Sequence, residues 1–468
     1  MPAEQRAPTV STGAGRARDV ATARKGYSRH NHVRSLQRTL YRAAKQDRRR
    51  AFHALYQHLW REDVLWESWR RVRSNGGSGG VDGVNIKAFE AVAHEELKNI
   101  ADELRNRTYR AAPIRRVYIP KPNGEERPLG IPTIRDRVVQ GAIVLVLEPI
   151  LEARAYEHSY GFRPRRSAHD AVNMVRRMVL GGYEKVLDLD IRKFFDSVPH
   201  SKLLSTLRQH TADGPLLGLI KRALKAPVME PNGVLHASRI GCPQGGPLSP
   251  ILANAYLSIL DFWFTKKTSY RDLVWIRYAD DGVVVSRRPL GDLRQRIEHV
   301  LSRMGLKVHP DKTHEVDLGA VGGTIDFLGF RIARRRAQTT ARRALLFYPT
   351  PKACAGVREK LRGVVPTRGG QLPDQVARRA NRVLRGWVQY FRLSNRREPF
   401  RALDRYVHDR MRHFMMRRRG LRHRGTRKYP DGWLRERLGL LSPYIEYVKL
   451  RTRANADGRR TRESRVRE

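Results

Sequence analysis

The stretch WIRYADDGVVVS, Trp275–Ser286, places two adjacent aspartates between two apolar runs. Short runs rich in β-branched and aromatic side chains predict strands, and an Asp-Gly pair between two such runs is a strong signal for a tight hairpin turn. We therefore expect Asp281 and Gly282 to make the turn between two antiparallel strands. The neighbouring Asp280 raises a second question, which is whether the tip of this hairpin also carries a metal site.

A second strand supplies partners for this pair of aspartates. In VLDLDI, Asp188 and Asp190 lie on one face because strand side chains alternate between the two faces. Unpaired carboxylates on an apolar strand are costly, and two of them repel by about 4 kcal/mol at about 4 Å in a medium of dielectric constant near 20. If Asp190 meets the hairpin tip, the cluster needs cations, and hard oxygen ligands favour Mg²⁺. Two Mg²⁺ ions there would promote nucleotidyl transfer.

The charge of the chain indicates its partner. The 468 residues contain 93 Lys and Arg against 46 Asp and Glu, a formal net charge of +47. Solvated surfaces usually mix both signs and lie nearer neutrality, so this excess predicts a long polyanion such as a nucleic acid. A basic membrane-surface protein is the alternative, but no apolar run approaches the ~20 residues of a spanning helix. The two cysteines are too far apart to suggest a zinc site.

The pattern along the chain predicts an α+β fold with a mainly antiparallel sheet. Residues 1–35 lack a periodic apolar face and are expected to form a basic, disordered arm, followed from Leu36 by amphipathic helices. Strands and helices then alternate irregularly to about residue 345. Beyond this point, an apolar stripe at helical spacing predicts a basic helical domain; it comprises Val376, Val383, Leu384, Trp387, Val388 and Phe391.

Two further segments frame the hairpin tip. IPKPNGEERPLGIP contains Asn123-Gly124, a turn signal that predicts a hairpin with Lys121 and Arg127 on its arms. GCPQGGPLSP is a glycine- and proline-rich loop, and Ser249 begins the helix that follows it.

Seven segments in order resemble the reverse transcriptases encoded by bacterial group II introns. They are IPKPNGEERPLGIP, SYGFRPRRSAHDA, LDLDIRKFFDSVPH, GCPQGGPLSPILANAYLSILD, RYADDGVVV, GLKVHPDKT and DFLGF. RGWVQYF, further on, resembles the maturase domain of the same family, and the resemblance covers roughly residues 36–445. It implies a right-hand polymerase with fingers and palm in 36–345, an α-helical thumb/maturase (X) domain in 346–445 and a basic tail in 446–468.

The resemblance implies the metal-binding residues. Asp190, Asp280 and Asp281 would be the catalytic carboxylates that hold two Mg²⁺ ions, and the backbone carbonyl of Ile191 would assist them. Asp188 would be a structural neighbour, and so would Asp196.

The resemblance also implies the residues that bind the nucleotide. Lys121 and Arg127 would grip the triphosphate, Phe195 would lie against the sugar 2′ position and exclude ribonucleotides, and Gln244 would line the pocket. The alternatives are a pair of solvated hairpin charges, a core phenylalanine and a plain turn before a helix.

Two assignments concern the primer and the leaving group. Phe327, Leu328, Gly329 and Phe330 match the primer grip of the family, although apolar packing accounts equally well for the two phenylalanines. Lys312 is a candidate general acid for the leaving pyrophosphate, and a solvated lysine is the simpler interpretation.

The resemblance implies an RNA-directed DNA polymerase that also binds its intron RNA to assist splicing and retrohoming. Its partners would be group II intron RNA, an RNA template with a DNA primer, target DNA and dNTPs, in the bacterial cytoplasm or at the nucleoid and without a membrane. After residue 445 there is no Cys pair and no HNH-like histidine cluster, so the expected type lacks an endonuclease. The alternatives are an RNA-binding splicing cofactor without polymerase activity, or the reverse transcriptase of a retron, a diversity-generating element or a defence system.

Overall fold

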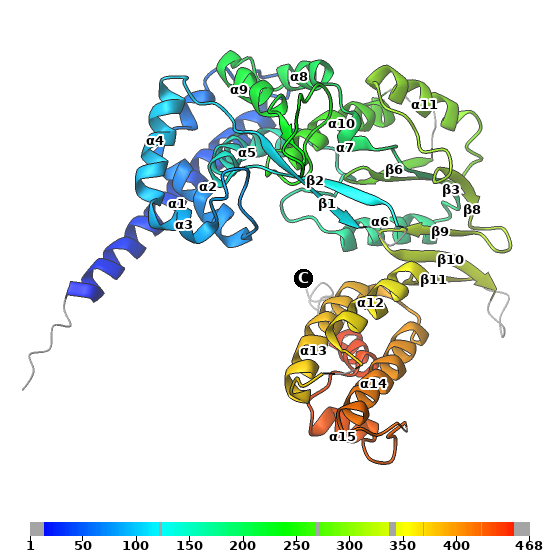
Figure 1. Cartoon of the computed structure of the whole chain (residues 1–468). Coiled ribbons are helices and arrows are strands. Elements are labelled where there is room, and N and C mark those ends of the chain that lie inside the picture. The colour runs from blue at the N-terminus through cyan, green and yellow to red at the C-terminus, as the bar shows by residue number, and fades with distance from the viewer. Residues whose placement is uncertain are drawn as a thin grey trace, which may run out of the picture. The chain divides into compact units, whose positions relative to one another are not determined.

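The computed structural model describes residues 14–120, 124–266, 272–336, 343–367, 369–422 and 424–453. The chain forms two compact units, and each unit combines stretches that are separated in the sequence (Figure 1). The first contains Met1–Arg166, Ile191–Ser269 and Gln295–His309, and the second contains Ser167–Asp190, Tyr270–Arg294 and Pro310–Glu468. The two units are described separately below.

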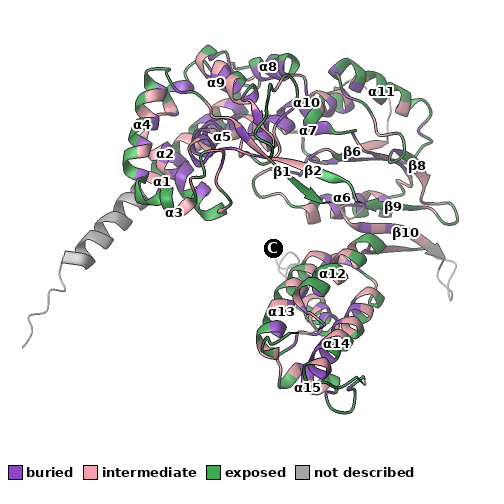
Figure 2. Ribbon diagram, in the orientation of Figure 1, coloured by how far each residue is buried: buried purple, intermediate pink, exposed green. Residues whose placement is uncertain are grey.

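Helix α5 (Ile134–Arg154) is the centre of the first unit. It is buried on most of its faces, as Figure 2 shows in purple, and its apolar sequence explains why. Helices α1 (Ala14–Gln46) and α2 (Glu62–Asn75) pack against it. A Cβ at Gly141 would lie 2.2 Å from the Ser68 hydroxyl oxygen, so only glycine lets α2 approach α5 this closely.

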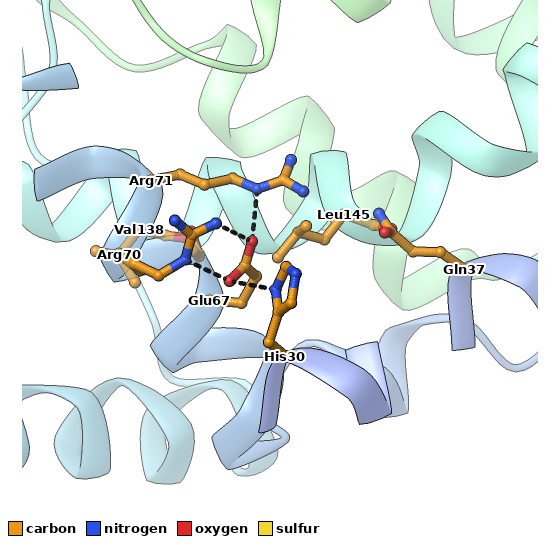
Figure 3. Close-up of polar contacts among 8 residues, drawn as sticks. His30, Gln37, Glu67, Arg70, Arg71, Val138 and Leu145 are labelled. Atoms are coloured by element: carbon orange, nitrogen blue, oxygen red, sulfur yellow. Dashed lines mark hydrogen bonds and ion pairs between the residues drawn. The ribbon is translucent and has the colours of Figure 1, made fainter. Parts of the chain in front are cut away.

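Polar contacts fix these three helices to one another (Figure 3). The Ser68 hydroxyl donates to the Val138 carbonyl at 2.6 Å, and the Gln37 amide donates to the Leu145 carbonyl at 3.0 Å. Buried Glu67 accepts hydrogen bonds from two arginines of its own helix, and His30 of α1 lies 3.2 Å from the same carboxylate. Burial alone would raise the pKa of Glu67, but the arginine hydrogen bonds outweigh it and lower the pKa to about 2.

The prediction of a disordered arm over residues 1–35 is wrong from Ala14 onward, because α1 begins there. Alanine and arginine are good helix formers, and the helix is anchored to the unit from His30 and from Val33, which is 1% exposed. Residues 1–13 lie outside the described residues, so for them the prediction stands as a prediction.

The predicted Lys/Arg hairpin is present in the first unit. Strands β1 (Ile114–Pro120) and β2 (Glu126–Ile131) pair antiparallel, from Arg115 opposite Ile131 to Pro120 opposite Glu126. Strand β1 also pairs in parallel with β4 (Val228–Met229), which pairs with β5 (Leu235–His236). The remaining helices of this unit are α3 (Ile86–Ala91), α4 (Ala93–Arg105), α7 (Phe194–Ser197), α8 (His200–Arg208), α9 (Gly214–Leu224) and α10 (Ser249–Lys266).

A four-stranded antiparallel sheet forms the centre of the second unit, in the order β6-β7-β3-β8. Its strands are β6 (Leu273–Tyr278), β7 (Asp281–Ser286), β3 (Lys185–Leu189) and β8 (His314–Asp317). Helix α6 (Ala168–Leu180) packs on β6 and β7. The chain enters α11 (Leu293–Met304) after β7.

The hairpin turn lies two residues earlier than the sequence predicted. Tyr278 pairs with Asp281, so Ala279 and Asp280 form the turn and Gly282 is a strand residue opposite Arg277. The prediction that Asp281-Gly282 makes the turn is therefore wrong. Gly282 is needed for packing instead, because a Cβ there would lie 2.0 Å from Cη2 of the buried Trp275. Ala279 adopts φ 56°, a left-handed conformation that is unfavourable for alanine.

A second, three-stranded sheet belongs to the same unit. It consists of β9 (Thr324–Phe327), β10 (Phe330–Arg336) and β11 (Arg343–Pro349), all antiparallel. Helices follow, as predicted: α12 (Pro351–Val364), α13 (Pro373–Tyr390), α14 (Glu398–Arg418), α15 (Asp431–Glu436) and a helical segment from 443 to 453.

The apolar stripe predicted on α13 is a core face. Val376, Leu384 and Val388 are fully buried, and the first two belong to a core that α12 and α14 complete with Leu361 and Phe414. Both cysteines are free thiols, and none of the described helices is long and apolar enough to cross a membrane. The predicted α+β class is confirmed.

The packing of Gly282 yields a stability test. We expect Gly282→Ala to lower the free energy of unfolding by about 1–3 kcal/mol, because the new methyl group overpacks against Trp275. Gly386→Ala on α13 is the matched control, since no atom lies within 4 Å of its Cβ position. Alanine is the better helix former, so the control should be stabilised by about 0.8–1 kcal/mol. Equal denaturant midpoints for Gly282→Ala and the wild type would contradict the strand register.

Candidate active site

Strand pairing brings the predicted carboxylates together. Leu189 at the end of β3 pairs with Gly282 of β7, and the two strands are antiparallel. Asp190, which follows Leu189, and Asp281, which precedes Gly282, therefore lie at the same edge of the sheet. Asp280 precedes Asp281 in the turn. All of these residues belong to the second unit.

Two carboxylates in this region have raised pKa values, those of Asp188 and Asp281. Burial is the main reason why the pKa of Asp281 rises to about 6, and the neighbouring Asp280 and Asp190 raise it further. The pKa of Asp188 rises to about 7, first through burial and then through Asp281, Asp190 and Asp326. The Asp281 residue keeps contact with solvent, so water screens part of the repulsion.

A segment just before β8 holds Asp190 in place. The backbone N–H of Asp190 donates to the hydroxyl of buried Thr313 at 3.2 Å. The Lys312 ammonium lies 3.4 Å from the Asp190 carboxylate, although 60% of the lysine side chain is exposed. Lys312 also lowers the pKa of Asp281. The candidate general acid is thus a partner of the acidic cluster, whereas the sequence did not single out Thr313.

The donor chemistry of this cluster fits Mg²⁺. Asp190, Asp280 and Asp281 offer hard carboxylate oxygens, and their mutual repulsion is what a bound cation would relieve. Within the described residues, however, no three Asp, Glu, His or Cys side chains converge closely enough to hold an ion as they stand. Ile191 is 4% exposed and forms an isolated bridge with Val308 within the first unit.

Two of the predicted nucleotide-binding residues meet in the first unit. The Arg127 guanidinium donates to the Gln244 side-chain oxygen at 2.8 Å, and the Gly130 N–H donates to the Gln244 carbonyl at 2.7 Å. A Cβ at Gly245 would lie 2.4 Å from the Gly130 carbonyl oxygen, and Gly245 has φ 125°, so this loop requires glycine. Lys121 lies outside the described residues.

Phe195 lines a pocket of about 390 Å³ in the first unit. It is 8% exposed, and Arg116 and Lys193 line the same pocket. The sequence analysis missed both of these basic residues. Arg116 could have been found from its place on the β1 arm of the Lys/Arg hairpin, whereas Lys193 carries no signal beyond its position two residues before Phe195.

The four predicted primer-grip residues form the β9–β10 corner. Phe327 and Phe330 are 2% and 0% exposed, as their apolar-packing interpretation requires. Leu328 and Gly329 make the turn and stay partly accessible. The Tyr390 hydroxyl donates to the Leu328 carbonyl at 2.8 Å. Sequence reasoning used the segment around Tyr390 only as a family marker and assigned it no role.

Two family models match the chain. Residues 119–332 match the reverse transcriptase (RNA-dependent DNA polymerase) family, and residues 355–430 match the group II intron, maturase-specific domain. The first match contains every predicted carboxylate. The second covers α13, α14 and most of α12.

The chain is also similar to several named proteins. The chain is 32% identical to Protein YkfC of Escherichia coli over 69% of its own length and 93% of that protein. It is 34% identical to the group II intron-encoded protein LtrA of Lactococcus lactis subsp. cremoris over 54% of its length, and spans 41% of LtrA. The putative COX1/OXI3 intron 1 protein of Saccharomyces cerevisiae is 25% identical over 58% of this chain and 38% of that protein. The chain therefore belongs to the family of group II intron-encoded reverse transcriptases and maturases.

Proposed function

We propose that the protein is an RNA-directed DNA polymerase whose catalytic carboxylates are Asp190, Asp280 and Asp281. The observation that supports this most directly is the β3–β7 pairing, which puts Asp190 and Asp281 at one sheet edge. The pKa of Asp281 is raised by burial and by Asp280 and Asp190, and Lys312 compensates this only in part. An acidic edge of this kind suits a reaction in which divalent cations and phosphate oxygens meet.

Asp190, Asp280 and Asp281 would hold two Mg²⁺ ions, with help from the Ile191 carbonyl. When bound, the ions would supply Lewis-acid stabilisation of the attacking and leaving oxygens. The chain's own residues orient the site: Thr313 fixes the backbone at Asp190, and the strained Ala279 directs Asp280 and Asp281. Asp188 of β3, two residues before Asp190, would carry a proton near neutral pH.

The nucleotide would be bound by Lys121, Arg127, Gln244 and Phe195. A guanidinium suits bidentate contact with phosphate oxygens, and the Gln244 side chain holds that of Arg127 in position. Phe195, at the wall of its pocket, would exclude a 2′-hydroxyl group. The expected substrates are therefore dNTPs, together with an RNA template and a DNA primer.

A maturase role in RNA splicing is the second part of the proposal. Arginines on one face of α13 line a hollow of about 630 Å³; they are Arg378, Arg379, Arg382 and Arg385. This face is opposite the buried stripe of the same helix, and its charge suits the phosphates of an RNA. The RNA partner would be group II intron RNA, and the protein would bind target DNA during retrohoming.

The competing function is a splicing cofactor that has no polymerase activity. It predicts RNA binding without primer extension. The retained carboxylates and the Arg127–Gln244 pair favour the polymerase.

Replacing both turn carboxylates tests the polymerase assignment. We expect Asp280→Ala with Asp281→Ala to abolish cDNA synthesis from a primed RNA template with Mg²⁺ and dNTPs, because the site loses two of its three ligands. RNA binding, measured by filter retention, should persist. The wild type is the control, and full extension by the double variant would show that the site is elsewhere.

The ionisation of Asp188 predicts a pH-dependent stability. Its pKa rises from 3.8 to about 7 on folding, so the folded state holds the proton more tightly than the unfolded state does. This contribution is complete below about pH 4 and is lost as the pH rises through 7. We therefore expect Asp188→Asn, in the absence of Mg²⁺, to raise the melting temperature by an amount that grows from pH 4 to pH 7 and then levels off. A gain in melting temperature that does not change with pH would contradict the raised pKa of Asp188.

Two substitutions test Lys312 as the general acid. As an acid, it should be replaceable neither by alanine nor by arginine, because a guanidinium does not release its proton near neutral pH. We expect both variants to lower the single-turnover incorporation rate by about 10²-fold or more and to change its pH profile. If Lys312→Arg restores the rate, the residue is only a charge partner of Asp190, which lies 3.4 Å from it.

A further inference from the structure

The β9–β10 turn contains two consecutive residues in the left-handed region. Leu328 has φ 50° and Gly329 has φ 78°. Glycine adopts this conformation freely, but a leucine there is strained by its Cβ and persists only where surrounding contacts hold it. The contacts that hold Leu328 are therefore informative about what the turn does.

The turn is held from the C-terminal helical region and from β11. The Tyr390 hydroxyl, at the end of α13, donates to the Leu328 carbonyl at 2.8 Å. The Thr350 N–H, just after β11, donates to the Gly329 carbonyl at 2.9 Å. A Cβ at Gly329 would lie 3.5 Å from the Phe391 ring, which is ordinary contact. The hydroxyl of Tyr390 is thus a direct restraint on the strained residue itself.

Tyr390 is itself held firmly. Its backbone carbonyl lies 2.5 Å from Nε2 of His169, and its ring packs at 5.7 Å from Phe330 and 4.9 Å from Phe391 between ring centroids. Burial raises the pKa of the Tyr390 hydroxyl, and Tyr278 and Asp281 raise it further. The hydroxyl therefore lies within electrostatic reach of the hairpin that carries the catalytic pair.

We propose that Tyr390 is a positioning residue for the primer. Through its hydrogen bond to Leu328, it fixes the position of the β9–β10 turn relative to the 3′ end of the primer. This inference rests on the proposed polymerase function and on the primer-grip assignment of the turn. The helical C-terminal region then contributes to the chemical step through one hydroxyl group, in addition to any contact that it makes with RNA.

The phenylalanine variant isolates this hydroxyl. Tyr390→Phe keeps the ring and its packing on Phe330 and Phe391, and removes only the bond to Leu328. Tyr406→Phe is the matched control, since Tyr406 of α14 is also half-buried and its hydroxyl also donates to a backbone carbonyl, that of Arg358 on α12 at 3.3 Å.

The full-length variants are compared by single-turnover dNTP incorporation on an RNA template whose DNA primer ends in 2-aminopurine. We expect Tyr390→Phe to lower the maximal rate by roughly 5- to 100-fold, because a loosened 3′ end leaves the reactive geometry. The Kd for dNTP should stay unchanged, since Arg127 and Gln244 are untouched. The 2-aminopurine of the bound primer should fluoresce more strongly than with the wild type. Tyr406→Phe should match the wild type in all three measurements.

Three outcomes would overturn the assignment of Tyr390. They are a maximal rate equal to that of the wild type, an equal loss of rate and of melting temperature in both variants, or a loss that appears only in the Kd for dNTP. If the wild type extends no primer, the proposed polymerase function fails instead. The fluorescence of the bound primer then decides on Tyr390 alone: equal signals overturn the inference, and a brighter signal for Tyr390→Phe supports it.

Discussion

The pairing of β3 with β7 is the interaction on which the candidate active site depends. Five residues of β3 align with β7, from Lys185 opposite Ser286 to Leu189 opposite Gly282. The middle of β7, Val283 to Val285, is completely buried, so the register is set by apolar burial on the central strand. A slip of one residue would move each of these valines to the opposite face of the sheet, where it would have to be repacked, and would separate Asp190 from Asp281. The position of the carboxylates is therefore a consequence of core packing.

The same register has an electrostatic cost. It gathers Asp188, Asp190, Asp280 and Asp281, and together with burial this raises the pKa of Asp188 to about 7 and that of Asp281 to about 6. Lys312 offsets part of this repulsion. Clustered carboxylates of this kind lower the stability of the fold, and such clusters are common at catalytic centres. The strained Ala279 and Leu328 lie in the turns of this same unit, at the two places where it would meet metal and primer.

Sequence reasoning was most successful where one local rule dominated. The pairing of β1 with β2, the helix from Ser249 and the apolar stripe of α13 are present as predicted, because alternation, helix-start signals and helical period are local properties of the sequence. It failed at the arm, where α1 begins at Ala14, and at the turn before Asp281. In the strands beside that turn, the indole of Trp275 needs the space that Gly282 leaves, and this requirement overrides the usual preference of Asp-Gly for a turn.

The sequence by itself determined the α+β class and the order of the motifs, and it predicted which carboxylates form the candidate site, because periodicity and residue chemistry can be read from local patterns. Only the tertiary structure decided that Asp190 and Asp281 lie at one sheet edge, that Thr313 and Lys312 contact Asp190, and that Tyr390 reaches Leu328. These contacts join residues that are far apart in the chain. They follow from strand register and from the packing of the whole unit, which no local sequence pattern encodes.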